Sequence, residues 1–124
     1  QINRKSIVPD WKTYIDRERT LLPEAMKELG YATGFFGKWH LIPRAKPTER
    51  DDKKRVAELK GIANEYMPEE NGFDENFGGN HSANQGRNFF YPDYQKFPNL
   101  KGKGSEDECL TDVLTNCAVD FISI

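Results

Sequence analysis

Cysteine and histidine are scarce in this sequence, and long apolar runs are missing from it. The chain holds two cysteines and two histidines in 124 residues. None of its apolar stretches approaches the roughly 20 residues that a membrane-spanning helix needs. Cys109 and Cys117 stand eight positions apart, which on one helix separates them by about 12 Å and beyond disulfide reach. We therefore expect two free, buried thiols and no membrane span.

An excess of charge of one sign is also missing. Lysine and arginine together number 18 and the acidic residues 20, so the net charge is -2. The basic run at 53–55 is flanked by Asp51 and Asp52, which favours a solvated face over a phosphate-binding patch. These features exclude a basic nucleic-acid surface. No signal peptide is visible and the first residue is Gln1, so we expect a processed chain or an internal fragment.

A helix followed by a buried strand is predicted in the first third of the chain. Leu22, Met26 and Leu29 recur at i, i+4 and i+7, and Gly30 suits the left-handed position that ends a helix. Residues 31–36 are almost wholly apolar, which indicates a strand covered on both faces, as in a parallel sheet between helices. This order is half of an α/β unit, so we predict the α/β class.

The remainder of the chain divides into three parts. Residues 43–71 are charged and bracketed by prolines, and we interpret them as a variable surface insertion with a helix over 48–64. Residues 72–104 are rich in Gly, Asn, Pro and aromatics and predict a long loop region. Residues 105–123 predict an amphipathic helix that begins at a Ser105–Glu108 capping box and carries both cysteines on its apolar face.

The most informative stretch is "GYATGFFGKWHLIP", residues 30–43. If the strand continues through Trp39, alternation sends Lys38 and His40 to one side and the indole to the other. Ligands of open α/β sheets bind at the carboxyl ends of the strands. An ammonium beside an imidazole there suits an anion whose chemistry needs a proton moved. The alternative is a solvated lysine and a structural histidine.

Three segments resemble the sulfatase family, in family order. "GYATGFFGKWHL" is similar to the second sulfatase signature, "NGFDENFGG" to the segment that follows it, and "CLTDVLTNCAVDFI" to a helix further on. The resemblance covers residues 20–124, with 43–71 as the variable insertion. It identifies the chain, 1–124, as part of a sulfatase N-terminal catalytic domain with a partial alkaline-phosphatase-like α/β fold.

The resemblance implies hydrolysis of sulfate esters by a formylglycine nucleophile, made from Cys or Ser in a Cys/Ser-x-Pro-x-Arg motif, with a bound calcium ion. Lys38 matches the lysine that contacts the nucleophile and the sulfate. His40 matches the histidine that orients the nucleophile and helps release sulfate. Ser82, in "SANQG", corresponds to a serine near the sulfate in some members, with His81 and Arg87 as other polar candidates.

Two expected parts of a sulfatase site are missing from the 124 residues. Neither Cys-x-Pro nor Ser-x-Pro occurs, and Asp51–Asp52 follow a charged segment rather than an apolar strand, so we reject them as metal ligands. We therefore expect neither the nucleophile nor metal ligands in this chain, and no activity from the isolated 124 residues.

The resemblance also implies the setting of the parent protein. We expect a sulfatase whose substrate is a sulfated small molecule or saccharide, in the periplasm, outside the cell or in the lysosome. Two alternatives stay open: a non-catalytic or degenerate sulfatase-like binding fragment, and a phosphate or phosphonate monoester hydrolase of the same superfamily.

Overall fold

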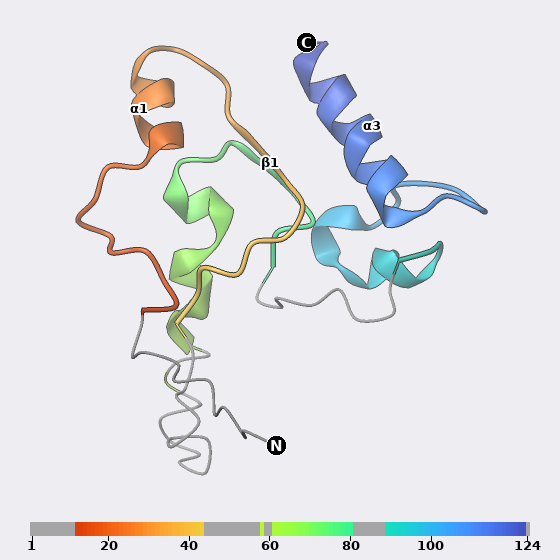
Figure 1. Cartoon of the computed structure of the whole chain (residues 1–124), viewed down its shortest axis with the longest axis horizontal. Helices are drawn as coiled ribbons and strands as arrows, with labels where there is room; N and C mark the ends of the chain where they lie inside the picture. The colour runs from red at the N-terminus through yellow and green to blue at the C-terminus, as the bar shows by residue number, and fades with distance from the viewer. Residues whose placement is uncertain (1–11, 44–57, 59–60, 81–88, 124) are drawn as a thin grey trace, which may run out of the picture.

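A computed structural model describes residues 12–43, 58, 61–80 and 89–123, and arranges them around a small central sheet (Figure 1). The elements in chain order are α1 (Leu22–Glu28), β1 (Gly34–Phe36), the 3-10 helices η2 (Ala63–Tyr66) and η3 (Pro68–Asn71), β2 (Glu75–Phe77), the 3-10 helices η4 (Asp93–Lys96) and η5 (Pro98–Leu100), and α3 (Leu110–Ile122). No helix among these residues is long and apolar enough to cross a membrane.

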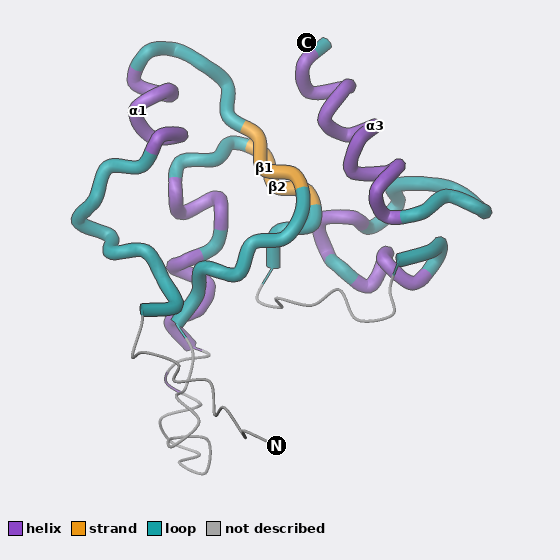
Figure 2. The backbone as a smooth tube through the Cα atoms, in the orientation of Figure 1, coloured by secondary structure: helices purple, strands orange, loops and turns teal. Residues whose placement is uncertain are grey.

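The two strands are parallel and lie between helical segments (Figure 2). Phe36 stacks on Phe77 at 5.3 Å between ring centroids and meets Phe121 of α3 at 5.7 Å. Phe35 points to the other face, where it contacts Trp39 and Phe73 edge-on. Helices thus accompany a small parallel sheet covered on both faces, which is compatible with the predicted α/β class.

The main apolar core lies between the sheet and α3. It comprises a buried group with partly buried phenylalanines packed against it, namely Tyr94, Leu100, Leu110, Val113 and Cys117 with Phe36, Phe77, Phe97 and Leu114. Both cysteines are free, as predicted, and Cys117 is buried, but Cys109, which we also expected to be buried, is only half-buried. Cys109 is not on the apolar face of the helix but precedes it, with its Sγ 3.0 Å from Asp112 Oδ2.

Helix α1 forms where the sequence predicts it. Glu24 Oε2 accepts the N–H of Leu21 at 2.7 Å, and Gly30, at φ +85°, ends the helix in a left-handed turn. None of the apolar positions that indicated this helix is buried, however: Met26 is half-buried, Leu22 is 75% exposed and Leu29 is 73% exposed.

Two predicted boundaries are wrong, and one short strand was not predicted. The strand expected over 31–36 begins at Gly34, because the N–H of Thr33 is bonded to a side chain rather than to a strand. The loop region 72–104 contains β2, which is too short to show a period of its own. The helix expected from Ser105 begins at Leu110: Glu108 does accept the N–H of Ser105 at 2.9 Å, but the pair closes a separate turn.

The predicted insertion at 43–71 is only partly described. Most of the helix expected over 48–64 lies outside the described residues. Ala63, Pro68 and Asn71 are buried, so the segment 63–71 does not lie wholly on the surface. That this region is a variable insertion stays a prediction.

A contact between Thr33 and Asp74 aligns the two strands. Asp74 Oδ2 accepts the N–H of Thr33 at 2.9 Å and lies 2.9 Å from its hydroxyl oxygen, which itself accepts the N–H of Asp74 at 3.1 Å. The other oxygen, Oδ1, pairs with Lys27 Nζ at 2.8 Å. These residues directly precede the paired Gly34 and Glu75, so the contact fixes the register of the sheet.

The Asp74 carboxylate makes the stability of the fold depend on pH. The Lys27 ammonium first, and then the bonds from Thr33, lower the pKa of Asp74 from 3.8 to about 2. A folded-state pKa below the unfolded value gives stability that is present above the unfolded pKa and lost as pH falls through the folded one. We predict that the gap in unfolding free energy between wild type and Asp74→Asn narrows between pH 5 and pH 2, measured by urea unfolding.

The variant Lys27→Met provides the control for this measurement. It removes the ion pair and leaves both Thr33 bonds, so its pH dependence should fall between those of the wild type and Asp74→Asn. A gap between wild type and Asp74→Asn that stays constant down to pH 2 would contradict the assigned role of the carboxylate.

The hydroxyl of Tyr94 gives a second prediction. This side chain is fully buried, and its oxygen has no hydrogen-bond partner among the described residues. Burying an unpaired hydroxyl costs about 1–3 kcal/mol, so Tyr94→Phe should raise the unfolding free energy by about 1 kcal/mol. Tyr31→Phe, whose side chain is 59% exposed, is the matched control with little expected change. A clear loss of stability in Tyr94→Phe would refute the prediction.

Candidate active site

The carboxyl ends of β1 and β2 meet at two glycine turns. The N–H of Gly37 donates to the carbonyl of Phe77 at 2.8 Å, which extends the ladder by one bond beyond the strands. Gly37 (φ +120°) and Gly78 (φ +88°) then turn the chain away in conformations that favour glycine. A Cβ on Gly78 would lie 3.3 Å from Gly37 O. The two turns are therefore in close contact.

Trp39 anchors the chain that leaves β1. Its side chain is 6% exposed, it meets Phe35 and Phe73 edge-on, and its Nε1–H donates to the carbonyl of Tyr66 at 2.6 Å. Ile42, three residues on, is also buried, and its carbonyl accepts the hydroxyl of Thr13 at 3.0 Å. The segment 38–42 is thus held in place at two buried residues, Trp39 and Ile42.

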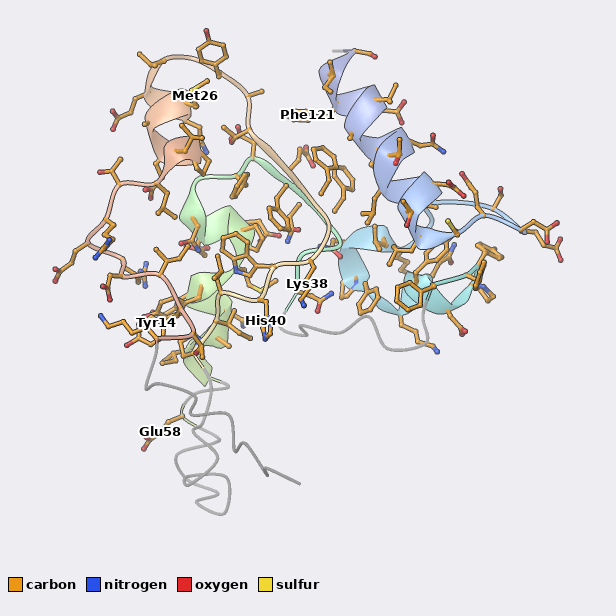
Figure 3. All side chains as sticks on the ribbon, viewed as in Figure 1. Tyr14, Met26, Lys38, His40, Glu58 and Phe121 are labelled. Atoms are coloured by element: carbon orange, nitrogen blue, oxygen red, sulfur yellow. The ribbon has the colours of Figure 1, made fainter. Side chains whose placement is uncertain are left out.

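Lys38 and His40 flank this anchor. Lys38 is exposed and His40 half-buried, while Trp39 between them is buried, so the predicted alternation is present. We had expected this alternation to come from a strand that continues through Trp39. Strand β1 instead ends at Phe36, and the chain turns at Gly37. Figure 3 shows the two labelled side chains near one another, just beyond the end of β1. Among the described residues, Lys38 forms no ion pair.

The backbone of His40 is strained. Its φ of +144° is one of two positive values at non-glycine positions in the described chain; the other is +71° at Asp107, in the left-handed region where Asp is enriched. Such conformations cost on the order of 1–3 kcal/mol and persist only where the surroundings impose them. Here the buried neighbours Trp39 and Ile42 impose it, and strain of this kind clusters at functional sites.

The remaining predicted candidates lie outside the described residues. They are the substrate-contact candidate Ser82, the alternatives His81 and Arg87, and the rejected pair Asp51–Asp52. In the described part of the chain, no group of three or more His, Cys, Asp or Glu side chains could hold a metal ion. The described side chains therefore do not fit the calcium ion that the family resemblance implies.

The arrangement suits the binding of an anion. An exposed ammonium at the carboxyl ends of parallel strands attracts negative charge, and an imidazole two residues away can give or take a proton near neutral pH. Gly37 carries no side chain, and a Cβ added to it would meet nothing within 4 Å, so the backbone of this turn is open to a ligand.

The sequence did not reveal the residues that support the segment carrying Lys38 and His40. Thr33 and Asp74 were quoted only as letters of two motifs, and their contact spans 41 positions, which no local pattern reveals. Asn76, buried at 7% exposure in β2, gave no signal because a lone asparagine in a polar loop is ordinary. The positive φ of His40 could not be predicted from the sequence either.

Comparison with known proteins bears on this site. The family model described as Sulfatase matches residues 3–124. An uncharacterized sulfatase of Schizosaccharomyces pombe is 36% identical over 63 residues, which are 49% of this chain and 11% of that protein. An arylsulfatase of Hemicentrotus pulcherrimus is 53% identical over 34 residues, 27% of this chain and 6% of that protein. The matched stretches thus span a small part of either relative.

The strain at His40 predicts an unusual response to substitution. Glycine adopts positive φ freely, so His40→Gly should be more stable than His40→Ala by about 1 kcal/mol, measured by chemical unfolding. Lys38 has no positive φ and should show the opposite order, with Lys38→Gly less stable than Lys38→Ala by about 0.5–1 kcal/mol. If His40→Gly is the less stable of its pair, the strain is absent.

Proposed function

Because the chain belongs to the sulfatase family, we propose that the protein hydrolyses sulfate esters and that Lys38 and His40 form one wall of its active site. The observation that carries this proposal is the pairing of an exposed lysine with a half-buried histidine around a buried tryptophan, at the carboxyl ends of two parallel strands. We further propose that β1, β2 and α3 are part of an alkaline-phosphatase-like fold, which the parallel pairing beneath a helix supports.

Each side chain has a distinct role in this proposal. The Lys38 ammonium binds the sulfate oxygens and stabilises the negative charge that grows on them during ester cleavage. The His40 imidazole acts as a general acid or base near neutral pH and transfers a proton in the step that releases sulfate. The formylglycine expected for the family would supply the nucleophile, and none of the 124 residues lies in the Cys/Ser-x-Pro motif that would form it.

Finer features of the protein are proposed on the resemblance alone. The substrate would be a sulfated small molecule or saccharide, with Ser82 as a further sulfate contact, and the parent protein would be exported to the periplasm, the exterior or the lysosome. The calcium ion would be bound by residues other than those described. The isolated 124 residues would be inactive because the nucleophile motif is missing from them.

We predict that the complete protein hydrolyses an aryl sulfate such as 4-methylumbelliferyl sulfate. Lys38→Ala should lower kcat/KM by about 100-fold, the loss expected when one stabilising charge is removed from a reacting oxyanion. Lys101→Ala is the matched control, because Lys101 is also exposed but belongs to a different segment, directly before the turn at Gly102. Initial rates measured across substrate concentrations give both constants.

Three results would contradict this proposal or redirect it. Unchanged turnover in Lys38→Ala would remove Lys38 from the site. Faster hydrolysis of the matching aryl phosphate would favour the phosphate or phosphonate monoesterase alternative, since a tetrahedral oxyanion of either kind fits a lysine–histidine wall. No hydrolysis of either ester by the complete protein would favour a degenerate binding role.

A further inference from the structure

We infer that Asn76 is a positioning residue for the anion-binding edge of the sheet. Its buried side chain holds the glycine turn after β2 against the glycine turn after β1, and so determines where Lys38 stands. This inference rests on the proposed function, because it concerns the same wall of the site. Asn76 itself touches no reacting group in this proposal and acts through the backbone that carries Lys38.

The Asn76 amide is fully bonded within the protein. Its Nδ2 donates to the carbonyl of Gly79 at 2.9 Å and to Glu69 Oε1 at 2.9 Å, while its Oδ1 accepts the N–H of Gly79 at 2.9 Å. Both amide hydrogens therefore have acceptors. The orientation of the amide is also determined, because exchanging the oxygen and nitrogen would place two donors together at Gly79 N and two acceptors together at Glu69.

Only an asparagine-sized amide can make this set of bonds here. Asn76 bonds both the N–H and the carbonyl of Gly79, three residues ahead of it, and thereby closes the chain into a small ring directly after β2. A second amide, Asn99 Nδ2, donates to the same carbonyl at 3.0 Å. The peptide groups of Gly79 are thus gripped by side chains from two separate segments.

The turn at Gly79 is packed too closely to move toward the sheet. A Cβ on Gly79 would clash with Asn76 Oδ1 and would lie 2.8 Å from Pro68 Cγ and 2.9 Å from Phe35 Cδ1. Gly79 therefore sits directly on the face of the sheet opposite α3. A loss of the Asn76 bonds frees the turn to move in the other direction, away from the strands.

This turn contacts the residue before Lys38. Gly78, inside the ring closed by Asn76, approaches Gly37 so closely that a Cβ on it would lie 3.3 Å from Gly37 O and 3.6 Å from Gly37 Cα. Gly37 is in turn bonded to the carbonyl of Phe77 at 2.8 Å. The path from Asn76 to Lys38 thus runs from the Asn76 side chain to Gly79, from the neighbouring Gly78 to Gly37, and along the chain to Lys38.

The expected effect is on turnover rather than on folding alone. A displacement of a catalytic group by about 1 Å can lower the rate on the order of 100-fold, because charge stabilisation depends on close geometry. Asn76→Asp keeps the size of the side chain and the acceptor for Gly79 N–H. It replaces the amide donor by an oxygen that faces Gly79 O and Glu69 Oε1 and repels both.

A double-mutant cycle separates positioning from general destabilisation. In the complete protein, Asn76→Asp should lower kcat/KM for 4-methylumbelliferyl sulfate by about tenfold, mainly through kcat. In a Lys38→Ala background the same change should lower it less than about twofold, because the group that Asn76 positions is already gone. A purely structural role would reduce kcat/KM by the same factor in both backgrounds.

Two further measurements support the cycle. The Asn116→Asp variant alters another amide that donates to a carboxylate, Glu108 Oε1 at 2.9 Å, on the exposed side of α3, and should leave kcat/KM unchanged. Thermal unfolding establishes that each variant is folded at the assay temperature. If Asn76→Asp does not fold, Asn76→Ser replaces it, since the serine adds no charge but removes both hydrogen bonds between the Asn76 side chain and Gly79.

The outcomes distinguish this inference from the proposed function. A wild-type protein that is active, with equal losses from Asn76→Asp in both backgrounds or with no loss in either, overturns the role of Asn76 and leaves the proposed function intact. A wild-type protein that hydrolyses no aryl sulfate overturns the proposed function and this inference together.

Discussion

The contact between Thr33 and Asp74 is the constraint on which the rest of the described structure depends. These residues stand 41 positions apart, and each directly precedes a strand. The carboxylate bonds the backbone and lies against the hydroxyl of Thr33, so strand pairing begins at one register and no other. Gly72 makes the approach possible, because at φ +89° it lies so close to α1 that a Cβ would be 2.6 Å from Glu24 N. The sheet, α1 and the "NGFD" segment are thereby held together.

A fixed register at the start of two parallel strands also fixes where they end. Both strands are three residues long, so their glycine turns fall side by side, and Asn76 secures one of them. The buried indole of Trp39 then leaves Lys38 and His40 as the polar groups of the segment, at the cost of a strained backbone at His40. The chemistry proposed for this edge therefore depends on contacts made at the opposite end of the strands, where the register is set.

Local patterns predicted the parts of this structure that depend on local physics. The period of α1, the glycine that ends it, the apolar face of α3 and the burial of Trp39 between two polar neighbours all follow from spacing along the chain. Strand β2 was missed because three residues with one charge show no period, and the helix start at Ser105 was misplaced because its capping pair closes a separate turn. The Thr33 and Asn76 bonds could not be predicted, since they join segments that only the fold brings together.

We propose that Lys38 and His40 face a bound sulfate, and a crystal structure of the complete protein soaked in inorganic sulfate would show whether they do. We expect a tetrahedral anion at the carboxyl ends of β1 and β2, with the Lys38 ammonium and the His40 imidazole each within about 3.2 Å of one of its oxygens. A sulfate bound at another pocket, with Lys38 extended into solvent and His40 turned toward the protein interior, would exclude both residues from the site.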